Sequence, residues 1–276
     1  MKNNELSDFA YSGLDELLNT EVMKNYNASI VDLCIHNIGN IDKVVDFGAG
    51  IGTLSIIMKE EYQISPICIE IDKTNRDFLK KRNLTTFDDL KKIDNKIELI
   101  FSSNVLEHIQ DDVSVLLQMK DKLKNNGKIY LYLPAKMFLW SKMDEMVGHF
   151  RRYEIRELKA ICRQIGLKIE VLHYADCLGF FASLVLKIFG YSKNSNLGSK
   201  SSLKFYDRWV FPISKFLDRI GFKFLFGKNI HLFKRIFKFS LVDKLILIFT
   251  LIVTIYALIP LGEADIFSKV IYAKIL

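Results

Sequence analysis

The chain has 276 residues, half of them hydrophobic, and a formal net charge of +7. This length can bury the core of one α/β domain and leaves room for appended segments. The cysteines (Cys34, Cys68, Cys162 and Cys177) have neither metal-site spacing nor the density of a disulfide scaffold. This argues against both classes and indicates free thiols in a reducing compartment.

The positive charge is concentrated towards the C-terminal end. Residues 200–244 hold 11 lysines and arginines against 3 acidic residues, whereas the rest of the chain is close to neutral. Aromatic side chains interleave with these cations, a pattern typical of contact with an anionic membrane surface. We expect no nucleic-acid partner, because the segment is too apolar for a surface that follows phosphates.

In chain order, one or two helices are expected over residues 14–40. Apolar runs typical of buried strands follow and alternate with segments of helical period. This alternation predicts a Rossmann-like, doubly wound α/β fold, with a mostly parallel sheet and helices on both faces. The predicted strands are residues 43–47, 66–70, 97–103, 127–133 and 168–174, and the predicted helices are residues 52–62, 73–83, 111–124 and 154–166.

The first strand runs into a glycine-rich turn and then a helix. Gly48, Gly50 and Gly52 follow Asp46, the penultimate residue of that strand. Glycines here let the backbone approach a ligand, and the helix that follows presents unpaired N–H groups. Glu70 ends the next strand, where its carboxylate can accept both hydroxyls of a ribose. The combination predicts a pocket for an adenosine-bearing cofactor.

The spacing of the turn narrows the choice of cofactor. A dinucleotide fingerprint would require its third glycine at position 53, where Thr53 stands instead. This disfavours a nicotinamide-dependent oxidoreductase. Asp46 suits a cofactor with an amino-acid end, because its carboxylate can face a positively charged amine directly or through water.

Two further motifs carry a family resemblance. Residues 101–112 read Phe-Ser-Ser-Asn-Val-Leu-Glu-His-Ile-Gln-Asp-Asp, and residues 147–153 read Val-Gly-His-Phe-Arg-Arg-Tyr. With the glycine turn, they resemble the class I S-adenosylmethionine-dependent methyltransferases, in particular the branch with Asn-x-Leu-Glu-His and Gly-His-x-Arg-Arg-Tyr segments. The resemblance covers about residues 20–230.

The resemblance implies S-adenosylmethionine as the cofactor. Asp46 and the glycines would surround its methionine end, and Glu70 would bind the ribose. Phe87 stands near the position where such enzymes often place an acid against the adenine edge, and Tyr26 with Asn27 would cap the cofactor. The implied cofactor-binding residues are Asp46, Gly48, Gly50, Gly52, Glu70, Ile71 against the adenine face, Phe87, and Ser103 and Asn104 over the methionine moiety.

Glu107 and His108 are the predicted catalytic residues. His108 follows the strand at which the site opens in this fold, where it could take the proton of a hydroxyl acceptor. The alternative is that both residues only orient the loop or cap the next helix. Quinone-ring O-methyltransferases resemble this stretch but use a Glu-x-x-Glu-His cluster, in some of them with a metal. Asn104 replaces the first glutamate, leaving Glu107, His108 and Asp111, so we expect no metal.

The second motif supplies the predicted acceptor-binding residues, His149, Arg151, Arg152 and Tyr153. Adjacent arginines beside a pocket suit a phosphate or carboxylate on the acceptor. The alternative is that they pair with Asp144 and Glu145 and hold a lid in place.

The last quarter of the chain departs from the family pattern. Residues 178–191 are apolar, residues 192–202 have the composition of a linker, and residues 227–230 begin like the final antiparallel strand of the branch. Either that strand is truncated to residues 229–233 and a membrane anchor follows, or the tail folds on the domain. Residues 245–261 carry no charge and, as a helix of ~1.5 Å per residue, would span about 26 Å. They would cross a membrane, lie in its interface or pack within protein. Cations precede this run more than they follow it, which predicts a cytoplasmic catalytic domain.

We divide the chain into an N-terminal helical cap (1–40), an S-adenosylmethionine-binding core (41–176), a substrate or lid and basic-aromatic region (177–232) and an apolar C-terminal extension (233–276). The predicted function is methylation of a hydroxyl or carboxyl oxygen on a small or lipid-linked acceptor near a membrane. The alternatives are a prenyl-quinone-type O-methyltransferase and a non-catalytic S-adenosylmethionine-binding module.

Overall fold

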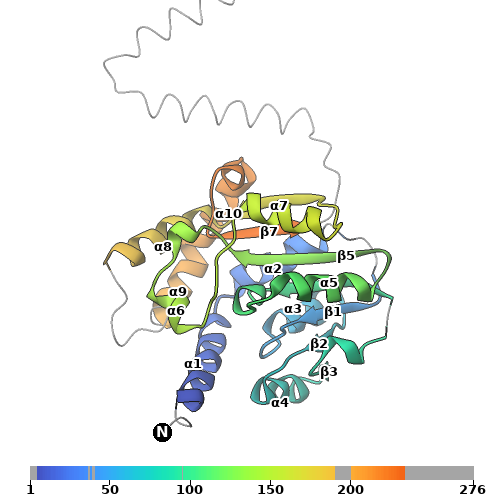
Figure 1. Cartoon of the computed structure of the whole chain (residues 1–276). Coiled ribbons are helices and arrows are strands. Elements are labelled where there is room, and N and C mark those ends of the chain that lie inside the picture. The colour runs from blue at the N-terminus through green and yellow to red at the C-terminus, as the bar shows by residue number, and fades with distance from the viewer. Residues whose placement is uncertain (1–4, 37, 39–40, 95, 190–199, 234–276) are drawn as a thin grey trace, which may run out of the picture.

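The computed structural model describes residues 5–36, 38, 41–94, 96–189 and 200–233. Within these residues, seven strands form one sheet in the order β3-β2-β1-β4-β5-β7-β6, with helices on both faces (Figure 1). The predicted Rossmann-like α/β fold is confirmed. The strand order reverses between β1 and β4, and ligands of open α/β sheets bind beyond the carboxyl ends of the strands at such a point.

The sheet is parallel except at β7. This strand lies between β5 and β6 and is antiparallel to both, so that residues 229–233 pair along their whole length with β6. The final strand, whose completeness the sequence left open, is therefore present over residues 229–233 and is paired on both sides. The strands are β1 (Val44–Phe47), β2 (Ile67–Ile69), β3 (Thr86–Phe87), β4 (Ile97–Ser103), β5 (Leu123–Pro134), β6 (Val171–Ala175) and β7 (Asn229–Phe233).

Two helices precede the first strand, as residues 14–40 predicted, although the first begins earlier, at Glu5. Asp72 starts another helix by accepting a hydrogen bond from the Asn75 N–H, the usual role of an N-cap aspartate. The helices are α1 (Glu5–Thr20), α2 (Lys24–Ile35), α3 (Thr53–Tyr62), α4 (Lys73–Lys81), α5 (Asp112–Lys122), α6 (Lys142–Met146), α7 (Ile155–Gln164), α8 (Cys177–Phe189), α9 (Lys200–Phe205) and α10 (Phe211–Arg219).

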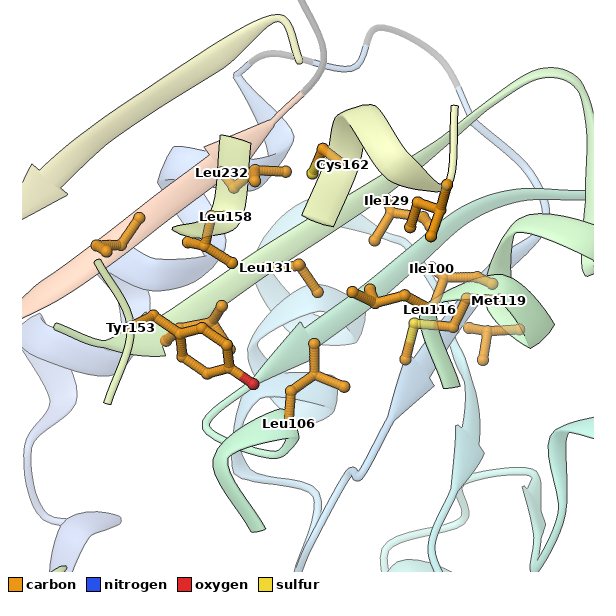
Figure 2. Close-up of a cluster of buried hydrophobic side chains, with 14 of the residues drawn as sticks. Ile100, Leu106, Leu116, Met119, Ile129, Leu131, Tyr153, Leu158, Cys162 and Leu232 are labelled. Atoms are coloured by element: carbon orange, nitrogen blue, oxygen red, sulfur yellow. The ribbon is translucent and has the colours of Figure 1, made fainter. Parts of the chain in front are cut away.

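Side chains of the central strands alternate between two cores, as the period of two in a strand requires. Ile100 and Leu131 join the core under α5 and α7, where Leu158 also packs (Figure 2). Phe101 and Tyr130 join the other core with α2 and α3, and their rings stack with centroids 5.1 Å apart. Burial on both faces explains why these strands read as continuous apolar runs.

Three strands differ from the prediction, and one of them, β6, begins at Val171 rather than at residue 168. β5 begins at Leu123, because Leu123 pairs with Ile97, and pairing with β4 resumes only at Lys128. The polar residues 124–126 interrupt the apolar run, so the sequence did not indicate that the strand begins at Leu123. β3 has only two residues, Thr86 and Phe87, too few for a detectable period.

The C-terminal predictions are described only in part. Residues 192–199 of the expected linker lie outside the described residues, and residues 200–202 begin α9. The charge-free run 245–261 also lies outside them. Within the part of the chain that is described, none of the helices combines the length and apolarity needed to cross a bilayer. The division into four segments stays a prediction.

Candidate active site

The glycine turn connects β1 to α3. Gly48, Gly50 and Gly52 have φ angles of +76°, +54° and +87°, in the left-handed region that glycine adopts without steric cost. A Cβ on Gly48 would lie 2.3 Å from a methyl carbon of Val105, so the loop after β4 also requires a residue without a side chain here. The turn therefore lies close to the neighbouring strand end, and its conformation depends on glycine.

Asp46 lies on β1 and is only 2% exposed. Its Oδ2 accepts a 2.5 Å hydrogen bond from the Ser55 hydroxyl of α3. Burial raises the pKa of the Asp46 carboxyl to about 7, although the hydrogen bond from Ser55 acts in the opposite direction. A cationic amine beside it would favour the charged carboxylate, which is the role predicted for this residue.

Glu70 directly follows β2 and bridges two segments of the predicted cofactor pocket. One carboxylate oxygen accepts from the Gly50 N–H at 2.7 Å, and the other accepts from the Asp72 N–H at 2.8 Å. The bridge fixes the distance between the glycine turn and the start of α4. Ile71 is 85% exposed, so its side chain is available to cover a flat ligand.

The other predicted cofactor residues lie at the same edge of the sheet. Ser103 ends β4, and Asn104 follows with φ of +53° and donates its N–H to the Tyr132 carbonyl of β5. Phe87 ends β3 beside Ile69. The predicted residues thus gather at the carboxyl ends of β1 to β4, which we call the cofactor edge. A turn of left-handed glycines, a buried acid and a strand-end carboxylate fit a nucleoside with an amino-acid tail.

Glu107 lies in the single 3₁₀ turn Leu106–His108 that follows β4. It is fully buried, and both carboxylate oxygens lack a hydrogen-bond partner among the described residues. Burial raises the pKa of Glu107 to about 8. Its Oε1 lies 3.9 Å from Nε2 of His149, and the His108 and His149 rings meet edge to face with centroids 4.6 Å apart. We call Glu107, His108 and His149 the acid–histidine cluster.

Asp144 holds His149 in place. Its Oδ1 lies 2.8 Å from Nδ1 of His149 and accepts a 2.7 Å hydrogen bond from Nε of Arg152. Burial alone would raise the pKa of Asp144, but the hydrogen bonds from His149 and Arg152 outweigh it and hold the pKa at about 2. Desolvation and the neighbouring His149 lower the pKa of His108 to about 4.

The remaining residues of the motif pair with a different acid. Arg151 lies 2.9 Å from Oδ1 of Asp112, and the Tyr153 hydroxyl donates to Oδ2 of the same carboxylate at 2.6 Å. Both arginines therefore form ion pairs with aspartates. The pair of Arg152 with Asp144 is the one that the alternative interpretation of the sequence predicted. Glu145 instead accepts from the Trp140 indole. Binding of an anionic acceptor by these arginines stays a prediction.

Sequence reasoning underestimated Asp112 and Asp144. Both are almost fully buried and carry the charge that organises the acid–histidine cluster and its surroundings. A local signal was present for Asp144, since Ser141 and Asp144 form a capping box at α6. Asp112 had no comparable signal, because its partners Arg151 and Tyr153 are about forty positions away.

Tyr26 and Asn27 connect distant parts of the chain. The Tyr26 N–H donates to Asp207, and its hydroxyl accepts from the Asn229 side chain at 2.8 Å. The Asn27 amide donates to the Thr20 carbonyl. Capping of the cofactor by these two residues stays a prediction.

A cavity of about 180 Å³ lies between α2, β6 and α10. Tyr26, Tyr132 and His173 contribute to its walls, together with Lys215, whose ammonium is 3.1 Å from Asp32. None of the residues of the cofactor edge or of the acid–histidine cluster lines it. It is therefore a separate feature of the face covered by α2.

Comparison with protein families gives one match, to a model described as a methyltransferase domain, over residues 19–172. The matched segment contains the cofactor edge and the acid–histidine cluster. No curated protein matches the chain.

Solved structures with related folds include an S-adenosylmethionine-dependent methyltransferase from Archaeoglobus fulgidus, with 16% identity, coverage of 75% of this chain and 91% of the other, and a TM-score of 0.48. A complex from Haloferax volcanii, of the Trm112 methyltransferase activator with a protein assigned as a methyltransferase, matches with 13% identity, coverage of 78% and 91%, and a TM-score of 0.52. At these identities the likeness concerns the fold.

Proposed function

We propose that this chain, which belongs to the methyltransferase domain family and is an S-adenosylmethionine-dependent methyltransferase, methylates an oxygen of a small or lipid-linked acceptor at a membrane surface. The observation that carries the proposal is the acid–histidine cluster directly after β4, next to the cofactor edge at β1 and β2. The acid–histidine cluster, whose side chains can accept or donate a proton, thus lies beside the cofactor edge, whose residues suit binding of the methyl donor.

The chain's own residues account for binding and orientation of the donor. Asp46 can face its amine, and Glu70 can exchange its hydrogen bonds to backbone N–H groups for the ribose hydroxyls. Ile71 can cover the adenine. S-adenosylmethionine, when bound, supplies an electrophilic methyl group on a positively charged sulfur. Alignment of the acceptor with that methyl group in a site shielded from water would provide most of the rate.

An oxygen acceptor is supported by the chemistry of the acid–histidine cluster. A hydroxyl that becomes methylated must lose its proton. Loss of that proton is promoted by a base that accepts it or by an electrophile that lowers the pKa of the hydroxyl. Glu107, His108 and His149 lie close together after β4 and are the side chains that could take up that proton. Arg152 and Asp144 lie behind them and keep His149 oriented.

A membrane location is supported by the surface of residues 177–189 and 200–225. α8 packs against α10, and apolar side chains on these helices, on α9 and on residues 206–225 are exposed to solvent. The Arg208 guanidinium lies 5.4 Å from the centroid of the exposed Trp209 ring. Apolar side chains rimmed by cations suit the boundary between anionic headgroups and acyl chains. The exposed apolar residues are Phe181, Val185, Leu186, Ile188, Phe205, Trp209, Ile213, Phe216 and Leu225.

Calorimetry and labelled methyl transfer test the enzymatic part. S-adenosylhomocysteine should bind the wild type and fail to bind Glu70→Ala and Gly50→Asp, while the exposed-surface variant Gln118→Ala binds normally. Incubation with labelled methyl donor and a membrane extract should label a lipid, quinone or glycan fraction. Preferential binding of NAD, or no label in any of the three fractions, would contradict the proposal.

Vesicle flotation tests the membrane part. The full chain should float with phosphatidylglycerol-containing vesicles more than with phosphatidylcholine alone, and high salt should reduce the difference. Trp209→Ser combined with Phe216→Ser should weaken binding, whereas Leu117→Ser on α5 should not. Equal binding to neutral and anionic vesicles would refute contact with an anionic surface.

A further inference from the structure

We propose that the acid–histidine cluster binds one divalent transition-metal ion, with Glu107, His108 and His149 as ligands and Zn²⁺ as the best-fitting ion. One ligand atom from each residue lies within 4.8 Å of the other two. Ligand atoms of a tetrahedral zinc site are roughly 3.3 Å apart, given Zn–N and Zn–O bonds of ~2.0–2.1 Å. Small side-chain rotations would therefore close the site around an ion.

The first support is the isolation of Glu107. Its side chain is fully buried, yet both oxygens lack a hydrogen-bond partner among the described residues. Buried polar groups are nearly always paired, so an orphaned carboxylate requires an explanation such as an ion. A cation between Glu107 and the two imidazoles would satisfy it.

The second support is the orientation of His149. The Asp144 carboxylate, which also accepts hydrogen bonds from Arg152 and Ser141, faces Nδ1 of His149 at 2.8 Å. Nδ1 therefore carries the proton, and the lone pair of Nε2 faces Oε1 of Glu107 across 3.9 Å. Two acceptors that face each other across such a gap suit a shared cation. A carboxylate that orients a ligand histidine in this way is typical of metal centres.

The surroundings match the charge and access that an ion needs. Glu107 and Asp144 supply two carboxylates, and Arg152 offsets one of them. His108 is exposed, which opens the cluster to solvent on one side, while Glu107 closes the other. Two imidazoles and one carboxylate form the N,N,O donor set of a zinc site with an open position, whereas Mg²⁺ prefers oxygen ligands.

The role of the ion rests on the proposed function. An acceptor oxygen in the open position would be held beside the cofactor edge, and the ion would lower the pKa of its O–H group. This would extend the catalytic part that the sequence predicted for Glu107 and His108, and it departs from the expectation of no metal at this stretch. Binding of the ion itself does not depend on that role.

Metal titration of the full chain, without an affinity tag and after treatment with EDTA, tests the proposal. Calorimetry and elemental analysis should find one Zn²⁺ per chain. Glu107→Gln and His149→Gln should each weaken Zn²⁺ binding at least tenfold, and the exposed His36→Gln should bind as the wild type does. Co²⁺ should bind the wild type with visible d–d bands and without a thiolate charge-transfer band.

Asp144 is a positioning residue in this scheme. Asp144→Asn should weaken Zn²⁺ binding by roughly 10–100-fold, with the stoichiometry and the shape of the Co²⁺ bands unchanged. Absence of Zn²⁺ binding to the wild type overturns the proposal. So does binding that persists in Glu107→Gln and His149→Gln, since surface or cysteine sites would then hold the ion.

Binding of S-adenosylhomocysteine is measured on the same samples. It verifies that the variants are folded and keeps the two proposals separate. A chain that binds S-adenosylhomocysteine and transfers methyl groups but binds no Zn²⁺ refutes the metal site and leaves the proposed function intact. One that binds Zn²⁺ at the cluster but methylates none of the tested fractions refutes the proposed function and leaves the metal site intact.

Discussion

Glu70 follows β2 and Glu107 follows β4 at the same edge of the sheet, on either side of β1, yet the hydrogen bonding of their carboxylates differs. Glu70 accepts hydrogen bonds from the N–H groups of Gly50 and Asp72, whereas Glu107 accepts none at its side chain from the described residues. The first acid is stabilised by turns of its own half of the sheet. The second faces His149, which arrives from a segment forty residues later.

The difference indicates two ways of preparing a site. The cofactor edge is organised by backbone shape and by hydrogen bonds that a ligand can replace. The acid–histidine cluster is organised by buried charges on Asp144 and Arg152, and it leaves Glu107 with unsatisfied capacity for a ligand. Substitutions that change the backbone conformation should therefore impair the cofactor edge. Substitutions that remove a buried charge should impair the acid–histidine cluster.

Arg152→Ala should have the largest effect on stability. The side chains of Arg152 and Asp144 are both buried, and removal of the guanidinium leaves the carboxylate without its main counter-charge. Breaking such a pair costs about 3–5 kcal/mol of unfolding free energy. Urea denaturation measures the change. Lys92→Ala, which removes an exposed ion pair with Asp88, serves as the control and should leave the midpoint unchanged; equal effects of the two would remove the contrast.

Gly48→Ala should be next. The new Cβ would meet Val105 at 2.3 Å in a residue with φ of +76°. Left-handed strain and overpacking together amount to about 2–4 kcal/mol, and the displaced turn should lose affinity for S-adenosylhomocysteine. In Gly13→Ala the Cβ would have open space, so that variant should match or slightly exceed the wild type in thermal unfolding and bind normally. Normal ligand binding by Gly48→Ala would show that the turn tolerates a side chain.

The Asp46 carboxyl should make both the stability of the protein and its affinity for the ligand depend on pH. Because its pKa is raised to about 7, the native state holds a proton that the unfolded state releases near pH 4. Asp46 therefore lowers the free energy of unfolding as pH rises between these values. An amine ligand favours the charged form, so affinity for S-adenosylhomocysteine should rise by up to about tenfold per pH unit below pH 7 and then level off.

Asp46→Asn provides the comparison for that titration. This variant should bind S-adenosylhomocysteine more weakly at pH 8 and lose most of the pH dependence between pH 6 and 8. Calorimetry at several pH values measures both. A wild-type affinity that does not change over this range would show that the ligand amine does not interact with Asp46.

His231→Phe should have the smallest effect and tests whether an unpaired buried group must serve a ligand. His231 on β7 is fully buried, its ring nitrogens lack partners among the described residues, and it stacks on His173 with centroids 4.6 Å apart. Burial lowers its pKa well below the usual value, so the unfolded state takes up the proton first and stability falls below about pH 6.5.

Phenylalanine at this position should preserve the packing and reduce the loss of stability in acid, with a gain of about 1 kcal/mol at pH 6. Zn²⁺ and S-adenosylhomocysteine binding should not change. Thermal unfolding between pH 5 and 8 measures the difference, with His36→Gln as an exposed control. A destabilised His231→Phe would instead indicate a structural role for the imidazole.

The cofactor edge was largely predictable because its signals are local. Gly48, Gly50 and Gly52 must occupy left-handed conformations at one turn, and Glu70 ends the next apolar run, so short segments identify both. The period of the strands likewise predicted the parallel sheet. β3 and the start of β5 were not recognised, since two residues carry no period and polar residues interrupt the other.

The sequence by itself determined the α/β fold, the turn for the cofactor and the two motifs around Glu107 and His149, because each depends on a residue's conformation or on an apolar period. Only the tertiary structure decided which charges pair: Arg152 with Asp144, Arg151 with Asp112, and Glu107 with neither arginine. Pairing of buried charges depends on distance and desolvation in three dimensions. Residues far apart in the chain can therefore belong to the same network of charges, as Arg151 and Asp112 do. Adjacent residues, such as Arg151 and Arg152, can belong to different ones.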